Sequence, residues 1–328
     1  MSRPLMFESA LGEGIELFVR HHRALGRRYE SEIWTLRLLD RFLVQSGISS
    51  IEEVSPAVID AFLASRPRRT ARSFNVLLGI VRHLFEWLVS RDVIERSPVV
   101  SRRRRHGDGR LPFLFDLEQA RVLIQTAGRM EDYRHTRLVG PTYRMVFALL
   151  YGLGLRVGEV RRLQVQDVDR ERELLFVRET KFAKSRLVPH GPVLARELYA
   201  YLDERALHGG AVASAPVFSV QRHRRDRPLG RGSIGKVFRR LLPSLDLRVG
   251  VGDAQPRVHD LRHSFAVGTL LRWYREGYDP ADRLLHLSTF MGHVQPQSTA
   301  VYLTITDELL RAGNERFEHF CHPTGGVS

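Results

Sequence analysis

The chain has 328 residues, about twice the usual domain size, which predicts two domains. It carries 51 Lys and Arg against 37 Asp and Glu, a net charge of +14, and its 43% apolar content is enough for packed cores. The single cysteine, Cys321, excludes an internal disulfide framework and a four-cysteine zinc site, and it fits a reducing compartment. The longest strongly apolar stretch, Met145 to Leu155, is too short for a membrane span, which needs about 20 residues. The N-terminus has no apolar signal core, so a soluble, cytoplasmic protein without a membrane partner is expected.

The excess of positive charge points to a polyanionic partner. A net charge of +14 produces a field that attracts polyanions and speeds their association, and nucleic acid is the commonest large polyanion in a cell. Nearly all of the excess is arginine, which contacts phosphate through two hydrogen bonds better than lysine does. Charge alone does not identify the partner, because many solvated surfaces are rich in arginine.

The first hundred residues predict a bundle of helices without strands. Glu30 to Leu43 places its apolar residues on one helix face, and Ser55 followed by Pro56 marks another helix start. Arg72 to Val89 predicts a further helix. Its inward residues are expected to be Val76, Ile80, Val81, Leu84, Phe85 and Leu88. These faces are interpreted as a hydrophobic core and not as a functional site.

Residues 101–111 predict a basic linker between domains at residues 1–100 and 112–328. The run from Ser101 to Arg110 is charged, contains glycine and has no apolar period. Its alternatives are a solvated tether and a strap across a phosphate backbone, and the net charge favours the strap. The candidate phosphate-binding residues are Arg66, Arg68, Arg69 and Arg72, for which a solvated helix face is the alternative, and Arg102, Arg103, Arg104 and Arg105.

The second part combines helices with two short strands. Asp116 to Gln119 forms a capping box that predicts a helix start, and Pro141 to Leu155 predicts a largely buried helix. Glu173 to Val177 and Ser185 to Val188 are strand candidates around a turn at residues 181–184. Further helices are predicted near Pro192–Leu207, Ser233–Leu242, Asp260–Tyr274 and Asp307–Phe317. The predicted fold class is mainly α with a small β-sheet.

Several familiar sites are excluded or disfavoured. Gly152 to Gly158 has the wrong spacing for a dinucleotide loop, and no βαβ pattern surrounds it. Asp167 and Asp169 lack a further acidic cluster that would complete a metal pair. At the C-terminal end, a frayed helix end is favoured over a zinc site made from His319, Cys321 and His322.

The remaining chemical candidates are basic or aromatic and lie far apart in the chain. Arg156 directly follows the buried helix, and a cation at such an apolar edge needs an anion, which Glu159 can supply. His259 and Arg262 are spaced to share one helix face. The full set is Arg156, Lys181, His259, Arg262, His293 and Tyr302. Taken singly, each has an ordinary structural explanation.

Taken together, these residues resemble the catalytic boxes of the tyrosine recombinase (phage integrase) family, which includes the Xer, Cre and lambda integrase proteins. The segments are GLRVGEVRRLQVQDVD with Arg156 and Glu159, TKFAKSRLVPH with Lys181, HDLRHSFA with His259 and Arg262, and MGHVQPQSTAVYL with His293 and Tyr302. The resemblance covers most of residues 110–318. It implies an N-terminal helical core-binding (SAM-like) bundle at residues 1–100 and a catalytic domain of the tyrosine recombinase type at residues 112–328.

The resemblance implies DNA strand transfer without a metal or other cofactor. Arg156 and Arg262 would hold the two non-bridging oxygens of a phosphodiester, because guanidinium forks match that geometry. Tyr302 would attack the phosphorus, leaving a 3′-phosphotyrosine and a free 5′-hydroxyl. The covalent intermediate keeps the energy of the phosphoester, so rejoining needs no ATP.

Supporting roles follow from the same boxes. His259 would handle the proton of the tyrosine, Lys181 would protonate the departing 5′-oxygen, and His293 would hydrogen-bond a phosphate oxygen. Glu159 would orient its basic neighbours. Lys184 is a rival for the lysine position, because it belongs to the same hairpin turn as Lys181.

The implied partner is double-stranded DNA carrying specific recombination sites, bound by a homo-tetramer or by a tetramer with a related recombinase. The sequence does not separate roles in mobile elements from replicon resolution. Two alternatives are a catalytically inactive DNA-binding protein of the same fold and an enzyme resembling type IB topoisomerase. The presence of every catalytic residue type argues against the first, and the spacing of the boxes argues against the second.

Overall fold

The computed structural model describes residues 7–27, 29–105, 112–133, 136–178, 185–208, 212–220, 228–247, 255–279, 281–292 and 302. Its contacts divide the chain into two compact units, Met1–Gly109 and Arg110–Ser328. Among the helices of these residues, none combines the length and the apolar character that a membrane crossing requires.

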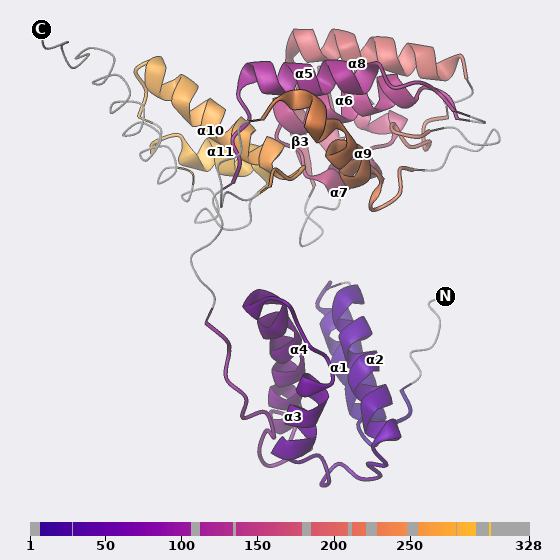
Figure 1. The fold of residues 1–328 in the computed structure, drawn as a ribbon, viewed down its shortest axis with the longest axis vertical. Coiled ribbons are helices and arrows are strands. Elements are labelled where there is room, and N and C mark those ends of the chain that lie inside the picture. Colours follow the sequence, from indigo (N-terminus) through magenta and orange to yellow (C-terminus); the bar gives the residue numbers. More distant parts are fainter. Residues whose placement is uncertain are drawn as a thin grey trace, which may run out of the picture. The chain divides into compact units, whose positions relative to one another are not determined.

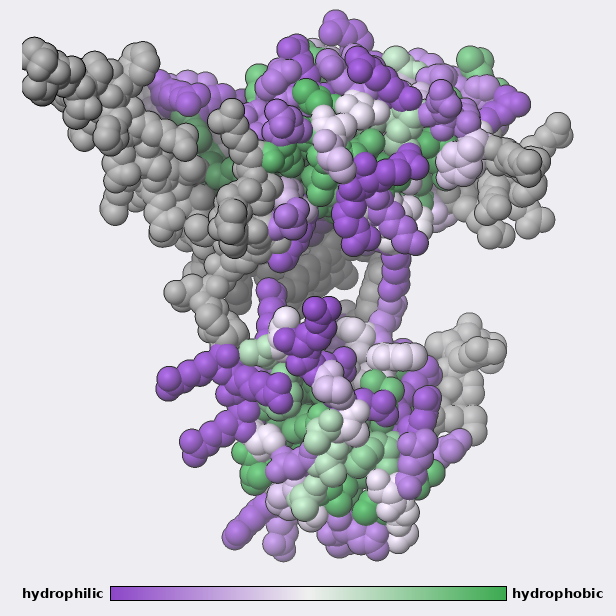
Figure 2. Space-filling view, in the orientation of Figure 1, coloured by the Kyte–Doolittle hydropathy of each residue, from purple (hydrophilic) through white to green (hydrophobic). Residues whose placement is uncertain are grey.

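The described residues of the N-terminal unit form four helices (Figure 1): α1 (Gly12–Ala24), α2 (Glu30–Gln45), α3 (Pro56–Ala64) and α4 (Ala71–Val89). As predicted from the serine–proline pair, the Ser55 side chain accepts a hydrogen bond from the backbone N–H of Val58, and Pro56 opens α3. Apolar faces of all four helices meet in one core, whose members include Phe18, Leu36 and Leu84. On the face shown in Figure 2, hydrophilic side chains project from this unit.

Helix α4 corrects one expectation about its inward face. Val76 was predicted to point into the core, but 58% of it is exposed. The buried residues of α4 follow the spacing i, i+3, i+4 and i+7 from Phe74, and include Leu77, Leu78 and Val81. Val76 precedes Leu77 by one residue, about 100° around the helix, so it turns away from the core.

The C-terminal unit is mostly helical. Its helices are α5 (Leu117–Gly128), α6 (Val139–Gly152), α7 (Val157–Arg162), α8 (Gly191–Ala206), α9 (Ser233–Leu241), α10 (Asp260–Arg275) and α11 (Leu284–Met291). Asp116 and Gln119 form the predicted capping box at the start of α5. The helix predicted at Asp307–Phe317 lies outside the described residues.

Three short strands form an antiparallel sheet in the order β1 (Val168–Asp169), β2 (Leu174–Val177) and β3 (Arg186–Pro189). Leu175 pairs with Val188 on the buried side, whereas Leu187 is exposed, as the alternation of a half-buried strand requires. The fold class predicted from the sequence, mainly α with a small β-sheet, is therefore confirmed.

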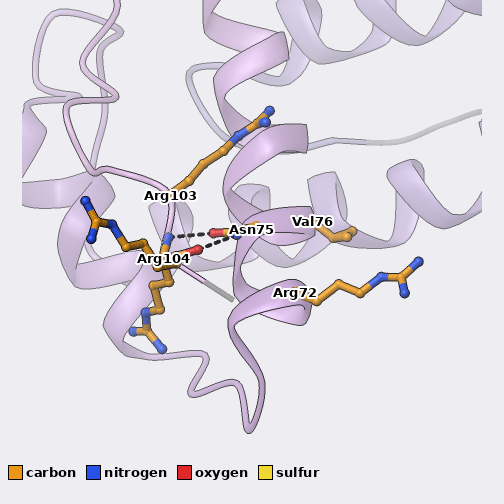
Figure 3. Close-up of a pocket in the computed structure, with 6 residues that line it drawn as sticks. Arg72, Asn75, Val76, Arg103 and Arg104 are labelled. Atoms are coloured by element: carbon orange, nitrogen blue, oxygen red, sulfur yellow. Dashed lines mark hydrogen bonds between the residues drawn. The ribbon is translucent and has the colours of Figure 1, made fainter. Parts of the chain in front are cut away.

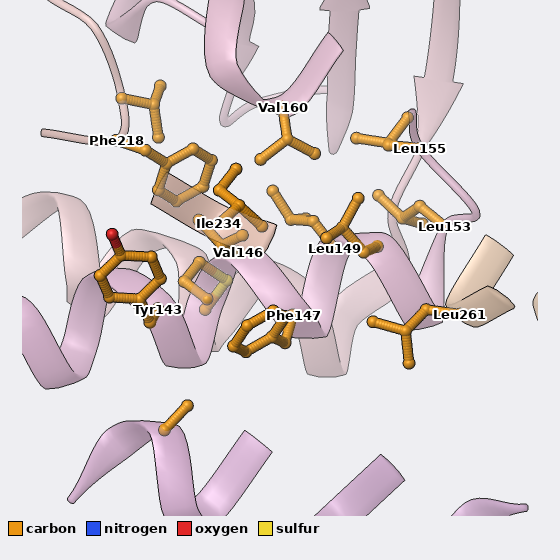
Figure 4. Packing of buried hydrophobic residues seen from close by; sticks show 14 of the residues in the cluster. Tyr143, Val146, Phe147, Leu149, Leu153, Leu155, Val160, Phe218, Ile234 and Leu261 are labelled. Atoms are coloured by element: carbon orange, nitrogen blue, oxygen red, sulfur yellow. The ribbon is translucent and has the colours of Figure 1, made fainter. Parts of the chain in front are cut away.

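Helix α6 lies at the centre of the main core of this unit. Tyr143, Val146, Phe147 and Leu149 are buried along it, and they pack against side chains from α7, α9, α10 and the neighbouring loops (Figure 4). This packing fixes the end of α6, from which the chain continues into Arg156 and α7. A second cluster lies on α10 and α11: Ala266, Val267, Leu270, Leu287, Met291 and Tyr302.

Candidate active site

Three arginines converge on the C-terminal end of α11. The last carbonyls of a helix have no partners within it and carry partial negative charge, so they attract cations. Here three consecutive carbonyls each accept a hydrogen bond of 2.8 Å from a different guanidinium: Phe290 from Arg186, Met291 from Arg262 and Gly292 from Arg156. Gly292 ends the helix in the left-handed conformation (φ +67°), and a Cβ there would lie 2.8 Å from the Arg186 side chain.

Glu159 lies between two of these arginines. Arg156 Nη1 donates to its Oε1 at 2.8 Å, and the backbone N–H of Arg156 donates to Oε2 at 2.9 Å. Arg186 donates to both oxygens, at 3.0 Å each. Burial by itself would raise the pKa of Glu159, but hydrogen bonds and charge from Arg186, followed by those from Arg156, lower this pKa to about 2. Glu159 is therefore a carboxylate at neutral pH, and it orients both guanidinium groups.

Arg262 is the more deeply buried of the two predicted phosphate-binding arginines, with 1% of the residue exposed. It donates to the carbonyl of Gly154 as well as to that of Met291. Burial and then the charge of Arg156 lower the pKa of Arg262 to about 9, so it remains protonated at neutral pH. Within the described residues, Arg156 and Arg262 each use two of five guanidinium N–H groups in these bonds. Both therefore keep donors for an anion.

Tyr302 lies in the apolar cluster of α10 and α11, with 2% of the residue exposed. Burial raises the pKa of its hydroxyl, while the positive charges of Arg262 and then Arg156 oppose that rise. The hydroxyl oxygen is 2.9 Å from Nδ1 of His263. The structure thus places the predicted nucleophile within the field of both predicted phosphate-binding arginines.

Two histidines line the start of α10. The rings of His259 and His263 meet edge to face with centroids 4.8 Å apart. Burial lowers the pKa of each to about 4. The charges of His263 and then Arg262 add to this effect for His259, and the charge of Arg262 adds to it for His263. Both are therefore neutral at pH 7.

The structure brings four predicted site residues into one place: Arg156, Glu159, Arg262 and Tyr302. The ring of His259 meets edge to face the ring of His263, whose Nδ1 lies 2.9 Å from the tyrosine oxygen. Lys181, its rival Lys184 and His293 lie outside the described residues, so their roles remain predictions. Among the described residues, no group of three or more His, Cys, Asp or Glu side chains is arranged to hold a metal ion.

Sequence reasoning missed two members of this cluster, Arg186 and His263. No role was predicted for Arg186, because its pairing with Glu159 joins residues 27 positions apart. The spacing from His259 to His263 is i to i+4, which places both imidazoles on one helix face, and that pattern was available in the sequence.

Comparisons with known proteins agree with this geometry. Residues 115–308 match the model of the phage integrase family. The integrase/recombinase y4rB of Sinorhizobium fredii is 36% identical over 316 residues, which cover 94% of this chain and 98% of that protein. The tyrosine recombinase XerA of Thermococcus kodakarensis is 34% identical over 199 residues, 60% of this chain and 64% of the relative.

Solved structures share the fold at low sequence identity. XerH recombinase bound to a palindromic difH substrate superposes with a TM-score of 0.62 at 17% identity, covering 87% of this chain and 80% of that one. The Tn1549 transposon integrase in complex with circular intermediate DNA gives 0.62 at 17%, covering 94% and 100%. From the family match, the full-length relative and the arrangement of arginines around Tyr302, we conclude that the chain belongs to the phage integrase family of tyrosine recombinases.

Proposed function

We propose that this protein cuts and rejoins double-stranded DNA at specific sites through a covalent 3′-phosphotyrosine at Tyr302. The observation that carries the proposal is the convergence of Arg156 and Arg262 on adjacent carbonyls, Gly292 and Met291, with both charges acting on the tyrosine hydroxyl. Two fixed guanidinium groups suit the two non-bridging oxygens of a phosphodiester. They also stabilise the charge that develops on those oxygens in the transition state.

Cleavage is a transesterification. The Tyr302 oxygen bonds to phosphorus, the bond from phosphorus to the 5′-oxygen breaks, and the 5′-oxygen receives a proton. By resemblance to the family, Lys181 supplies that proton, His293 binds a phosphate oxygen and His259 handles the proton of the tyrosine. Glu159 holds Arg156 in place. The reverse attack by the 5′-hydroxyl of another strand completes recombination, and no cofactor takes part.

The N-terminal unit offers a basic surface for the phosphates of the same DNA. The backbone of Arg104 is fixed by two hydrogen bonds of 2.8 Å to the side chain of Asn75, and its guanidinium lies 3.8 Å from the centre of the Phe74 ring. The first part of the linker is thus held against α4 by hydrogen bonds. Around this contact is a pocket (Figure 3) that we name the linker groove; its lining residues are Arg72, Asn75, Val76, Arg103, Arg104 and Arg105. Arginines held at such a groove suit a DNA backbone.

The other predicted phosphate-binding residues are not among the lining residues of the linker groove. Arg69 and Arg102 are exposed, whereas Arg66 and Arg68 are half-buried. Within the described residues, the Nε atoms of Arg66 and Arg68 are buried without a hydrogen-bond partner. Contacts of all four with DNA remain part of the proposal.

The proposed assembly and the proposed biological role are supported by the relatives. One solved relative is a lambda integrase tetramer bound to a Holliday junction, and this chain is proposed to act as a homo-tetramer or with a related recombinase. The integrase names among the relatives, together with the Tn1549 transposon integrase, favour movement of a mobile element over replicon resolution. Since the substrate is DNA, the proposed location is the cytoplasm.

Covalent trapping tests the proposal directly. The full chain is incubated with nicked duplexes of randomised sequence, and complexes that survive denaturation are isolated and sequenced. The wild type should yield such complexes on a defined sequence, whereas Tyr302→Phe should bind the recovered duplex without attaching to it. Arg156→Ala and Arg262→Ala should each slow attachment on the order of 100-fold or more. A wild type that never attaches to DNA would instead support an inactive DNA-binding protein.

A second readout separates the proposal from the topoisomerase alternative. A recombinase joins strands from two recovered duplexes, whereas a topoisomerase reseals the strand that it cut. The wild type should therefore produce recombinant duplexes from two differently labelled copies of the recovered site. Relaxation of supercoiled DNA of any sequence, without recombinant products, would favour the topoisomerase reading.

A further inference from the structure

The hydroxyl of Tyr302 contacts a histidine that the proposed mechanism does not use. His263 Nδ1 and the tyrosine oxygen are 2.9 Å apart, which is hydrogen-bond distance. Their ring centroids are 5.5 Å apart, and the ring of His259 meets that of His263 edge to face, with centroids 4.8 Å apart. Of the two histidines at the start of α10, His263 is therefore the one beside the reacting atom.

We propose that Nδ1 of His263, rather than His259, accepts the proton of Tyr302 when the hydroxyl attacks DNA. The inference rests on the proposed function and deepens it: the reaction stays the same, and His263 takes the proton-accepting role that the family resemblance gave to His259. This role requires the imidazole tautomer that carries its proton on Nε2, in which the tyrosine O–H donates to Nδ1. His259 then supports the ring of His263 through their edge-to-face contact.

The proton and electron pairs balance over one cycle. As the Tyr302 oxygen forms its bond to phosphorus, the O–H proton moves to Nδ1 and His263 becomes an imidazolium. The electron pair of the breaking bond goes to the 5′-oxygen, which is protonated by a separate acid. During rejoining, the 5′-hydroxyl attacks, the tyrosine oxygen leaves, and Nδ1 returns its proton to that oxygen.

The charges around His263 suit this role. Burial and the charge of Arg262 lower its pKa to about 4, so at pH 7 the ring is neutral and able to accept a proton. Among the described residues, the charged and titratable groups that act on the pair are His259, Arg262 and Arg156. The two arginines act against the rise that burial causes in the pKa of Tyr302. Because these cations also disfavour the imidazolium, proton transfer accompanies the attack and does not precede it.

The test isolates the attack from departure of the 5′-oxygen. The duplex recovered by covalent trapping is made in two forms, with oxygen or with sulfur at the bridging 5′ position of the scissile phosphate. Sulfur leaves without needing a proton, so the sulfur substrate bypasses the acid and reports the attack alone. The variants are His263→Asn, whose side-chain oxygen still accepts a hydrogen bond but takes no proton, and His259→Asn. The matched control is His286→Asn at an exposed position on α11.

His263→Asn should lower the cleavage rate on the order of 100-fold on both substrates. Between pH 6 and 9, its rate on the sulfur substrate should rise about tenfold per pH unit, because hydroxide must then remove the tyrosine proton. The wild type and His286→Asn should show a nearly flat profile over the same range. His263→Ala should regain activity when imidazole is added, which tests the role even if the asparagine variant folds poorly.

Three results would overturn the assignment. The first is that His263→Asn cleaves the sulfur substrate at the wild-type rate, and the second is that it cleaves slowly but with the flat pH profile of the wild type. The third is that the rate loss and the pH slope appear in His259→Asn instead. Failure of the wild type to attach to any duplex would instead overturn the proposed function itself.

Discussion

Arg186 and Glu159 face each other through two parallel hydrogen bonds, from Nη1 to Oε1 and from Nη2 to Oε2, both 3.0 Å long. The pair joins β3 to α7, and the third donor of the same guanidinium, Nε, binds the Phe290 carbonyl of α11. Only 11% of the Arg186 side chain and 1% of the Glu159 side chain are exposed. This pair therefore links β3 to α7 and α11, the two helices that position Arg156 and Arg262.

Removal of Arg186 should destabilise the catalytic unit. Arg186→Ala leaves a buried carboxylate with one cation in place of two, and breaking a buried pair in this way typically costs about 3–5 kcal/mol. Arg144→Ala is the matched control, because its pair with Glu197 is about half exposed and is expected to contribute at most about 1 kcal/mol. Urea unfolding of the full chain measures both. Equal losses of unfolding free energy in the two variants would show that the buried pair contributes no more to stability than the exposed pair.

Gly154 supports Arg262 through its carbonyl and should not tolerate a side chain. Its φ is +57°, and a Cβ there would overlap the ring of Phe265. Gly154→Ala is expected to cost about 2–5 kcal/mol, from the left-handed backbone and from the overlap. It should also slow covalent attachment, since the carbonyl that holds the buried guanidinium is displaced.

Gly268→Ala provides the comparison for that substitution. Gly268 is exposed within α10, and nothing lies within 4 Å of the added Cβ. Alanine should therefore stabilise the chain by about 0.5–1 kcal/mol through helix propensity. Thermal unfolding measures the stability of both variants, and trapping on DNA measures their rates of covalent attachment. A Gly154→Ala variant with unchanged stability and an unchanged attachment rate would contradict the role of this turn.

His22 should make the N-terminal unit sensitive to acid. Its ring stacks on Tyr29 at 4.6 Å, and neither ring nitrogen has a hydrogen-bond partner among the described residues. Burial, followed by the charges of His83, Arg27 and His21, lowers its pKa from 6.5 to about 4. Between these two values the unfolded chain binds more protons than the folded one, so stability is lost as pH falls below 6.5.

The expected result is a wild type that unfolds at lower urea concentration at pH 5 than at pH 7. His22→Phe keeps an aromatic ring in the stack but removes the titratable imidazole, so its stability should change less between pH 5 and pH 7. His286→Asn, at an exposed site, should behave like the wild type. An equal pH dependence in all three chains would exclude His22 as the source.

The periodic and local features of this fold could be predicted from the sequence. The apolar face of α2 and the caps at Ser55 and Asp116 depend on neighbouring residues, and the structure confirms them. The start of α6 was placed two residues late, since its cap is formed by Asp132, which accepts hydrogen bonds from the backbone N–H groups of Leu138 and Val139. That bond spans a loop, and no local pattern predicts it.

The site was predicted only as a set of residue types in a familiar order. The resemblance named Arg156, Arg262 and Tyr302, but nothing in their spacing shows that the end of α11 binds the two arginines. Helix α11 itself was not predicted; it has eight residues and begins without a capping side chain. Because its role depends on three carbonyls that meet cations from distant segments, only the folded chain reveals it.

The linker groove should contribute affinity for DNA without changing sequence preference. Replacing Arg103, Arg104 and Arg105 together by glutamine removes three proposed phosphate contacts. Each contact contributes about 0.9 to the slope of log K against log salt concentration, so the slope should become shallower by about 2 to 3. The matched control replaces Arg121, Arg170 and Arg196, exposed residues of the C-terminal unit that the proposed contacts do not use. Titration of the trapped duplex and of a scrambled duplex at several salt concentrations measures both variants. Weakening confined to the trapped sequence would show that the groove reads bases, and an unchanged slope would remove it from the DNA-binding surface.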